Sequence, residues 1–151
     1  MNKPVLFLRI ASVLTFIHAV LHTVGGVFGE VGPGSASMAA EAMKINRFLV
    51  AGNMRSFWDF YRGLGLAVTI FLTAESVLMW QLALLAKADA VRLRPMIATL
   101  FVAYAAFSIN SYQYFFFGPV ITEILIAVCL GIAIVTAKSS ATAHFGAAQR
   151  A

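Results

Sequence analysis

The chain has 151 residues, of which 61% are hydrophobic and only 11% are charged. Ordinary soluble domains carry about 25% charged residues, so this composition excludes a water-soluble globule. The mean hydropathy of +0.87 and the long uncharged runs predict a single integral membrane domain over residues 1–151. The single cysteine, Cys129, excludes an internal disulfide framework and any cysteine-built zinc or iron–sulfur site.

Four segments are long and apolar enough to serve as membrane spans, since a helix needs about 20 apolar residues to cross roughly 30 Å of hydrocarbon. The last two are separated at Phe117-Gly118-Pro119, because Gly and Pro together interrupt a helix. The sequence therefore predicts an all-α fold, a four-helix transmembrane bundle. Its predicted spans cover about residues 5–28, 57–86, 95–117 and 119–137.

The first loop, between the first two spans, is more than a connector. Glycines and Pro33 end the first span, and after Ser35 apolar residues return at helical spacing. This pattern predicts an amphipathic surface helix over about residues 36–50, which lies along the membrane surface or folds over the mouth of the bundle. Both roles, a packed surface helix and a lid, stay open.

The distribution of basic residues predicts the orientation of the chain. Lys and Arg accumulate on the cytoplasmic side of membrane proteins, and with four spans both termini share one side. That side carries Lys3, Arg9, Lys87, Arg92, Arg94, Lys138 and Arg150, and the opposite side carries Lys44, Arg47, Arg55 and Arg62. Because seven basic residues stand against four, we expect both termini in the cytoplasm.

Ionisable and amide side chains inside the spans are candidates for function, because an ionisable group at the bilayer centre costs roughly 2.5 to 3.5 kcal/mol. At a rise of about 1.5 Å per residue, His22, Asn110 and Glu123 fall at one level in the outer half of the membrane. His18 and Glu75 fall at a second level near its middle. His18 and His22 are four residues apart and share one helix face, which we expect to point inward.

These levels predict a polar pocket that opens outward. Its candidate catalytic residues are His22, Glu123, His18 and Glu75, and its candidate ligand-binding residues are Asn110, Gln113, Asp59 and Arg62. Histidine and glutamic acid together would pass a proton, with His18 and Glu75 as a path. The alternative is structural, since polar side chains in membrane bundles often only hold helices together, at about 0.6 kcal/mol each.

Several other chemistries find little support in the sequence. His18 and His22 form a His-x-x-x-His pair but lack the glutamate that a zinc protease carries beside the first histidine, so we expect no metal site. Cys129 lies in an apolar run, where a thiol acts as a small hydrophobic group. No basic run is interleaved with stacking aromatic residues, so we expect contact with the lipid bilayer and none with nucleic acid. The sequence identifies no cofactor.

The segment from Met54 to Leu66 is the most distinctive of the chain. Asp59 and Arg62 are three residues apart and can pair on a helix, which would lower the cost of placing both at the lipid boundary. In the alternative, Arg62 lies over the mouth of the pocket and holds an anionic head group or a carboxylate. Both residues would then guard the entrance.

Two stretches of sequence carry a family resemblance. Arg55-Ser56-Phe57-Trp58-Asp59-Phe60-Tyr61 and His22-Thr23-Val24-Gly25-Gly26 resemble a family of small bacterial four-helix membrane proteins without an established activity. The resemblance covers most of the chain, and it implies the fold and a bacterial inner-membrane location. In size and span number the chain is also similar to the emopamil-binding sterol isomerases and to small quinone-linked proteins, an analogy from which no residue role is taken.

Three functions fit these features. In the preferred one, the pocket binds or modifies a small amphipathic molecule such as an isoprenoid, a sterol-like lipid or a quinone, and whether the protein is an enzyme stays open. In the second, the protein is an accessory subunit of a larger membrane complex, and its polar groups only lock helices together. In the third, copies of the chain assemble into a transporter, because four spans alone make a small conduit.

Cysteine labelling tests the predicted threading. In a chain with Cys129→Ala, a Ser35→Cys variant should react with a membrane-impermeant maleimide added from the periplasmic side, because the first loop faces that side. An Arg92→Cys variant should react only after the inner membrane is opened. Reaction of both variants from the same side would contradict four spans with cytoplasmic termini.

Overall fold

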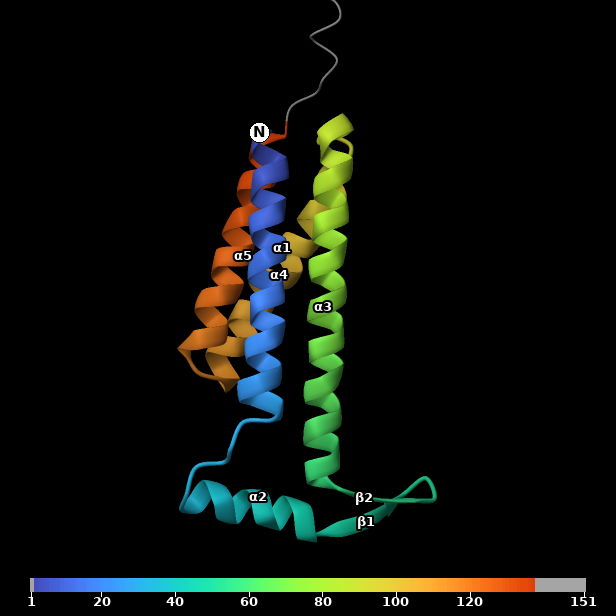
Figure 1. Ribbon diagram of the computed structural model, residues 1–151, viewed down its shortest axis with the longest axis vertical. Helices are drawn as coiled ribbons and strands as arrows, with labels where there is room; N and C mark the ends of the chain where they lie inside the picture. Colours follow the sequence, from blue (N-terminus) through green and yellow to red (C-terminus); the bar gives the residue numbers. More distant parts are fainter. Residues whose placement is uncertain (1, 138–151) are drawn as a thin grey trace, which may run out of the picture. The chain divides into compact units, whose positions relative to one another are not determined.

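The computed structural model describes residues 2–137 and is helical throughout most of its length (Figure 1). In chain order its elements are α1 (Lys3–Leu21), the π-helix η1 (His22–Val27), α2 (Ser35–Ile45), β1 (Arg47–Val50), β2 (Asn53–Ser56), α3 (Phe57–Asp89), α4 (Arg94–Tyr114) and α5 (Phe117–Thr136). These residues form two compact units. The first contains the described residues of 1–16 and 74–151, and the second contains residues 17–73.

Four helices are long and apolar enough to cross a membrane, which agrees with the four predicted spans. They are α1 together with η1, α3, α4 and α5. With 33 residues, α3 is about 50 Å long and so exceeds a hydrocarbon layer of about 30 Å. Lys138 and Arg150, which enter the count of basic residues above, lie outside the described residues.

In the first unit, the start of α1 packs against the second half of α3 through a seam of regularly spaced residues. The buried residues of this seam alternate at intervals of three and four, as in a left-handed helix pair. On α1 they are Val5, Leu8, Ser12 and Thr15, and on α3 they are Ser76, Met79, Ala83 and Ala86. Because many of these side chains are small, the helices approach closely enough for the hydroxyls of Ser12 and Ser76 to reach the backbone carbonyls of the opposite helix.

The helices α4 and α5 form a hairpin in the same unit. Phe115 and Phe116 adopt extended backbone conformations between them. The break therefore comes two residues before the predicted Phe117-Gly118-Pro119, because Pro119 fits the first turn of α5, where its missing N–H is not needed. At the other end of the hairpin, the Arg94 guanidinium donates to the carbonyl of Ala137 and ties the start of α4 to the end of α5.

The surface helix predicted over residues 36–50 is shorter in the structure and is followed by a β-hairpin. Helix α2 ends at Ile45, where Asn46 turns to an extended conformation and its Nδ2 donates to the carbonyl of Ala42 at 2.7 Å. The next residues pair as β1 and β2 around Ala51-Gly52, which both have positive φ, as in a type I′ turn. The helical spacing of apolar residues thus continued beyond the true helix end, and the all-α prediction missed this hairpin.

Within the second unit, α2 and the hairpin lie across the N-terminal end of α3 (Figure 1). Phe48 of β1 packs against the Phe57 ring at 4.9 Å and stacks on the Phe60 ring at 6.2 Å, between ring centroids. On α2, Lys44 forms an ion pair with Glu41 at 2.6 Å. The two contacts of Phe48 fix the hairpin against the first turn of α3.

The glycines after the first span include one position that admits no side chain. A Cβ on Gly29 would overlap the backbone carbonyl of Gly25, whereas a Cβ on Gly32 would meet nothing within 4 Å. Gly25 lies in η1, whose wide turns include the bond from the N–H of Phe28 to the carbonyl of Thr23 at 3.0 Å. The chain can leave the π-helix at this angle only because residue 29 is glycine.

We therefore expect Gly29→Ala to destabilise the protein by about 1 to 3 kcal/mol, the usual cost of forcing extra atoms into a packed site. Gly32→Ala is the matched control and should change stability by no more than about 0.5 kcal/mol. The free energy of unfolding in detergent, measured with a denaturant, checks both values. Equal stabilities of the two variants would contradict the close approach at Gly29.

Candidate functional site

The polar side chains of the first unit meet on the buried face of α4. The Tyr104 hydroxyl donates to Glu75 Oε2 at 2.8 Å and lies 3.3 Å from Thr15 Oγ1. Tyr104 is fully buried and Glu75 is partly exposed. One phenol thus joins α1, α3 and α4 at a point inside the apolar helices.

A second set of hydrogen bonds joins α1 and α3 close to that point. The Ser12 hydroxyl donates to the carbonyl of Ser76 at 2.7 Å, and the Ser76 hydroxyl donates to the carbonyl of Ser12 at 2.9 Å. Both serines are buried. Since each hydroxyl is fully used by the opposite backbone, this pair holds the helices together and offers little to a ligand.

The acid of α5 has a similar hydroxyl partner on α4. Glu123 is 5% exposed, and its Oε1 accepts a hydrogen bond from the Ser111 hydroxyl at 2.9 Å. Its Oε2 is buried and has no partner within residues 2–137. Ser111 follows Tyr104 by seven residues, so one face of α4 presents a hydroxyl to each acid at points about 10 Å apart along the helix.

This arrangement leaves each acid with one oxygen available. Within residues 2–137, Lys44 and Glu41 form the one ion pair, so no described basic side chain neutralises Glu75 or Glu123. No group of three or more His, Cys, Asp or Glu residues is placed to hold a metal ion in the same part of the chain. A carboxyl oxygen without a partner can accept a hydrogen bond from a ligand or take up a proton.

The two histidines of the first span belong to the second unit, apart from the two acids. His22 Nε2 lies 3.0 Å from the carbonyl of Gly65, and a carbonyl only accepts, so this nitrogen carries the hydrogen. His18 Nδ1 is buried without a partner in the described part of the chain. Each unit therefore has its own buried polar groups, and the proton path from His18 to Glu75 stays a prediction.

Asn110 and Gln113 do not lie in the interior, contrary to their predicted role as pocket residues. Both side chains are exposed. The buried face of α4 is formed by Ile97, Tyr104 and Ser111, at intervals of seven residues. Asn110 precedes Ser111 by one residue, which turns its side chain about 100° away from that face. Ser111, the residue after Asn110, contacts Glu123 instead.

Asp59 does not pair with Arg62 in the structure. Asp59 Oδ2 accepts hydrogen bonds from the N–H of Ser56 at 2.9 Å and from its hydroxyl at 3.1 Å, while the Ser56 hydroxyl accepts from the N–H of Asp59 at 3.2 Å. These two residues form a capping box at the start of α3. The Arg62 guanidinium instead lies 4.9 Å from the centroid of the Phe28 ring. Helix capping, rather than an ion pair, explains this motif.

The predicted site did not include Tyr104 and Ser111, which hold the acids, or Thr15, which contacts the Tyr104 hydroxyl. The predicted site consisted of ionisable and amide groups and contained no hydroxyl, because hydroxyls are common in apolar helices. The sequence spacing could have identified the two hydroxyls on α4. Tyr104 and Ser111 follow Ile97 at intervals of seven residues, so all three share one helix face. That interval, read together with the position of Glu123, would have identified Ser111.

The fold and this site define a helical protein with four helices able to span a membrane and two acids held by hydroxyls inside those helices. Comparison with protein-family models, with curated proteins and with solved structures found no match.

We expect Tyr104→Phe to weaken the first unit by about 1 to 3 kcal/mol, since it removes the donor on which the Glu75 carboxyl depends. Tyr112→Phe is the matched control, because Tyr112 is exposed, and it should leave stability unchanged. A double-mutant cycle with Glu75→Gln, read by unfolding in detergent, measures the coupling between the two side chains. Additive effects of the two substitutions would show that the hydrogen bond contributes nothing.

Proposed function

We propose that the protein is a multi-pass protein of the bacterial inner membrane, with both termini in the cytoplasm, and that its first unit binds a small amphipathic molecule. Four helices of sufficient length and hydropathy support the membrane location. The Glu75 carboxyl supports the binding function, because one of its oxygens is held by Tyr104 and the other accepts no hydrogen bond within residues 2–137.

The energy of placing Glu75 in an apolar helix is the reason to look for a ligand. An ionisable side chain near the centre of a membrane costs roughly 2.5 to 3.5 kcal/mol, whereas one hydrogen bond between helices contributes about 0.6 kcal/mol. The bond from Tyr104 does not offset that cost. Small residues such as Ala83 and Ala86 already give α3 its close packing, so an acid is not needed to hold the helices together.

The side chains around Glu75 favour a particular kind of ligand. The free carboxyl oxygen accepts a hydrogen bond, so the ligand carries a hydroxyl group on its polar end. Leu78 of α3, one turn beyond Glu75 in the same unit, is exposed, which favours an apolar body. Isoprenoid alcohols, sterol-like lipids and reduced quinones share this combination of one hydroxyl with an extended apolar skeleton.

Glu123 offers a second acceptor in the same unit. Its unpartnered Oε2 is buried, and a buried polar atom without a partner calls for an explanation such as a bound water or a catalytic role. We assign to Glu75, which is partly exposed, the contact with the ligand. Glu123 then acts as an inner acid that is closed off from the surroundings.

Mass spectrometry of the small molecules retained by the gently purified protein tests this proposal. The wild-type protein should retain an apolar alcohol or quinol, and Glu75→Gln should bind the same molecule about tenfold more weakly, the value of one hydrogen bond to a charged acceptor. Glu30→Gln is the matched control, because Glu30 is exposed in the loop after η1, and it should retain the molecule in full.

Two outcomes would overturn the proposal. Equal retention by Glu75→Gln and the wild type would remove Glu75 from the site. If the wild-type protein retains no such molecule and Glu75→Gln only lowers its stability, Glu75 has a structural role. That role is expected for an accessory subunit of a larger complex.

A further inference from the structure

The β-hairpin of the second unit brings two arginines to a single backbone oxygen. Arg55 Nη1 donates to the carbonyl of Met54 at 3.0 Å, and Arg47 Nη2 approaches the same oxygen at 3.4 Å. Arg55 pairs with Phe48 across the hairpin and Arg47 pairs with Ser56, so the two side chains start from opposite faces and converge at one point. Both arginines are exposed.

Two guanidinium groups at this separation repel each other, and the described residues do not neutralise them. Neither arginine forms an ion pair within residues 2–137. Asp59 lies within electrostatic reach of both, but its Oδ2 is already occupied by Ser56 in the capping box. One carboxylate against two guanidinium groups leaves a single positive charge, which a singly charged anion would balance. Phosphodiesters carry that charge, and guanidinium groups bind phosphate oxygens in pairs.

A hollow of about 400 Å³ opens beside Arg55, and Arg47 reaches toward it through the Met54 carbonyl that both guanidinium groups share. Its lining consists of Val50, Asn53, Arg55, Asp59, Phe60, Gly63 and Leu64. Asn53 and Arg55 come from the hairpin and Asp59 from the first turn of α3, while the apolar members are Val50 of β1 and, after Asp59 along α3, Phe60 and Leu64. A Cβ on Gly63 would meet nothing within 4 Å, so the space above this residue is open. The hollow therefore passes from polar to apolar along the direction of the helix.

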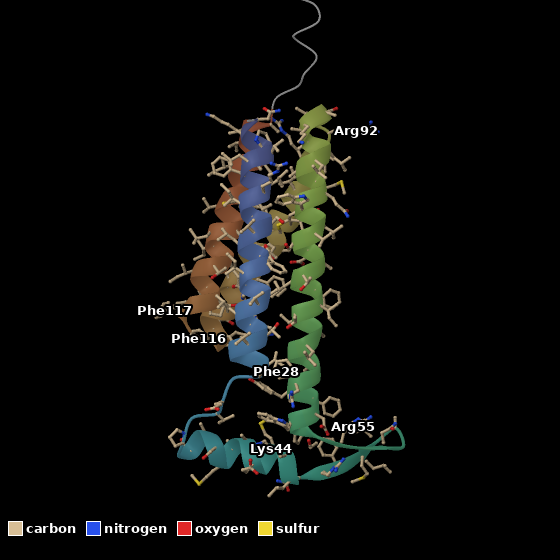
Figure 2. All side chains as sticks on the ribbon, in the orientation of Figure 1. Phe28, Lys44, Arg55, Arg92, Phe116 and Phe117 are labelled. Carbon is tan, nitrogen blue, oxygen red and sulfur yellow. The ribbon has the colours of Figure 1, made fainter. Side chains whose placement is uncertain are left out.

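The place of the hollow in the chain matches the boundary of a membrane. It lies at the first two turns of α3, a helix long enough to reach beyond the hydrocarbon layer. Arg55 marks this end of α3 in Figure 2. Large apolar side chains of the same segment are exposed beside the arginines, among them Leu49, Met54 and Phe57. Exposed apolar residues next to basic ones are typical of segments that lie in the head-group region.

We propose that Arg47 and Arg55 form a binding site for the phosphodiester of an anionic phospholipid, whose acyl chain lies along Phe60, Gly63 and Leu64. The guanidinium groups hold the phosphate from two sides, and the hollow receives the first part of the chain. This site lies in the second unit, and it is independent of the binding function proposed for Glu75 in the first. It would seat the hairpin at the membrane surface through one bound lipid.

Native mass spectrometry of the full chain in detergent with added phosphatidylglycerol tests the site. The double variant Arg47→Gln/Arg55→Gln should bind the lipid about tenfold more weakly than the wild type, since it loses charge-assisted bonds to phosphate. The double variant Lys87→Gln/Arg92→Gln removes the same charge from two other exposed positions, and it should bind within about twofold of the wild type.

Two further arms separate the lipid from other anions. Gly63→Leu should also weaken phosphatidylglycerol binding, because the new side chain fills the hollow while both arginines remain. Excess inorganic phosphate should not displace the lipid, since it cannot use the apolar part of the site. Circular dichroism and elution volume verify that each variant folds, which is expected because all the altered residues are exposed.

The proposal is overturned if the two double variants weaken binding equally, because attraction would then follow net charge alone. It is equally overturned if Gly63→Leu binds like the wild type, or if inorganic phosphate displaces the lipid. In the last case the arginines bind a free phosphate rather than a head group.

Discussion

A carboxylate in a long apolar helix has to find a hydrogen-bond donor on a neighbouring helix, because hydrocarbon offers none and the N–H groups of its own helix already bond to carbonyls. In the first unit, α4 meets this constraint with two hydroxyls seven residues apart, one for Glu75 and one for Glu123. In the same unit, the hydroxyls of Ser12 and Ser76 also bond across two helices. The relative positions of α1, α3, α4 and α5 within the unit thus depend on where these few hydroxyls stand.

The charged residues at the ends of the helices are accommodated in a different way. Arg62 lies on Phe28 and Arg9 lies 5.1 Å from the centroid of the Trp80 ring, while Asp59 caps α3 through Ser56. Aromatic rings and backbone N–H groups replace opposite charges in these contacts. The same preference leaves Arg47 and Arg55 without an acidic partner, and this makes them available to an anion from outside the chain.

The two units therefore offer complementary chemistry to amphipathic molecules. The first presents carboxyl oxygens that accept a hydrogen bond, inside helices able to cross a membrane. The second presents guanidinium groups that donate hydrogen bonds, beside exposed apolar residues at the start of α3. A hydroxyl on an apolar skeleton suits the first site and a phosphodiester suits the second. Both proposals make this chain a protein that recognises lipids by their polar ends.

The sequence by itself determined the four long apolar helices and the break between the last two, close to Pro119, because hydropathy and helix-breaking residues can be read along the chain without knowing its neighbours in space. The β-hairpin was missed because the spacing of the apolar residues Phe48 and Leu49 also suits a helix. In the structure the helix ends at Asn46, and Ala51-Gly52 form the turn of the hairpin. Only the tertiary structure decided that Tyr104 and Ser111, rather than Asn110, face the acids. The side of a helix that becomes buried depends on which neighbour packs against it, and a chain in which most residues are apolar carries little contrast from which to read that side.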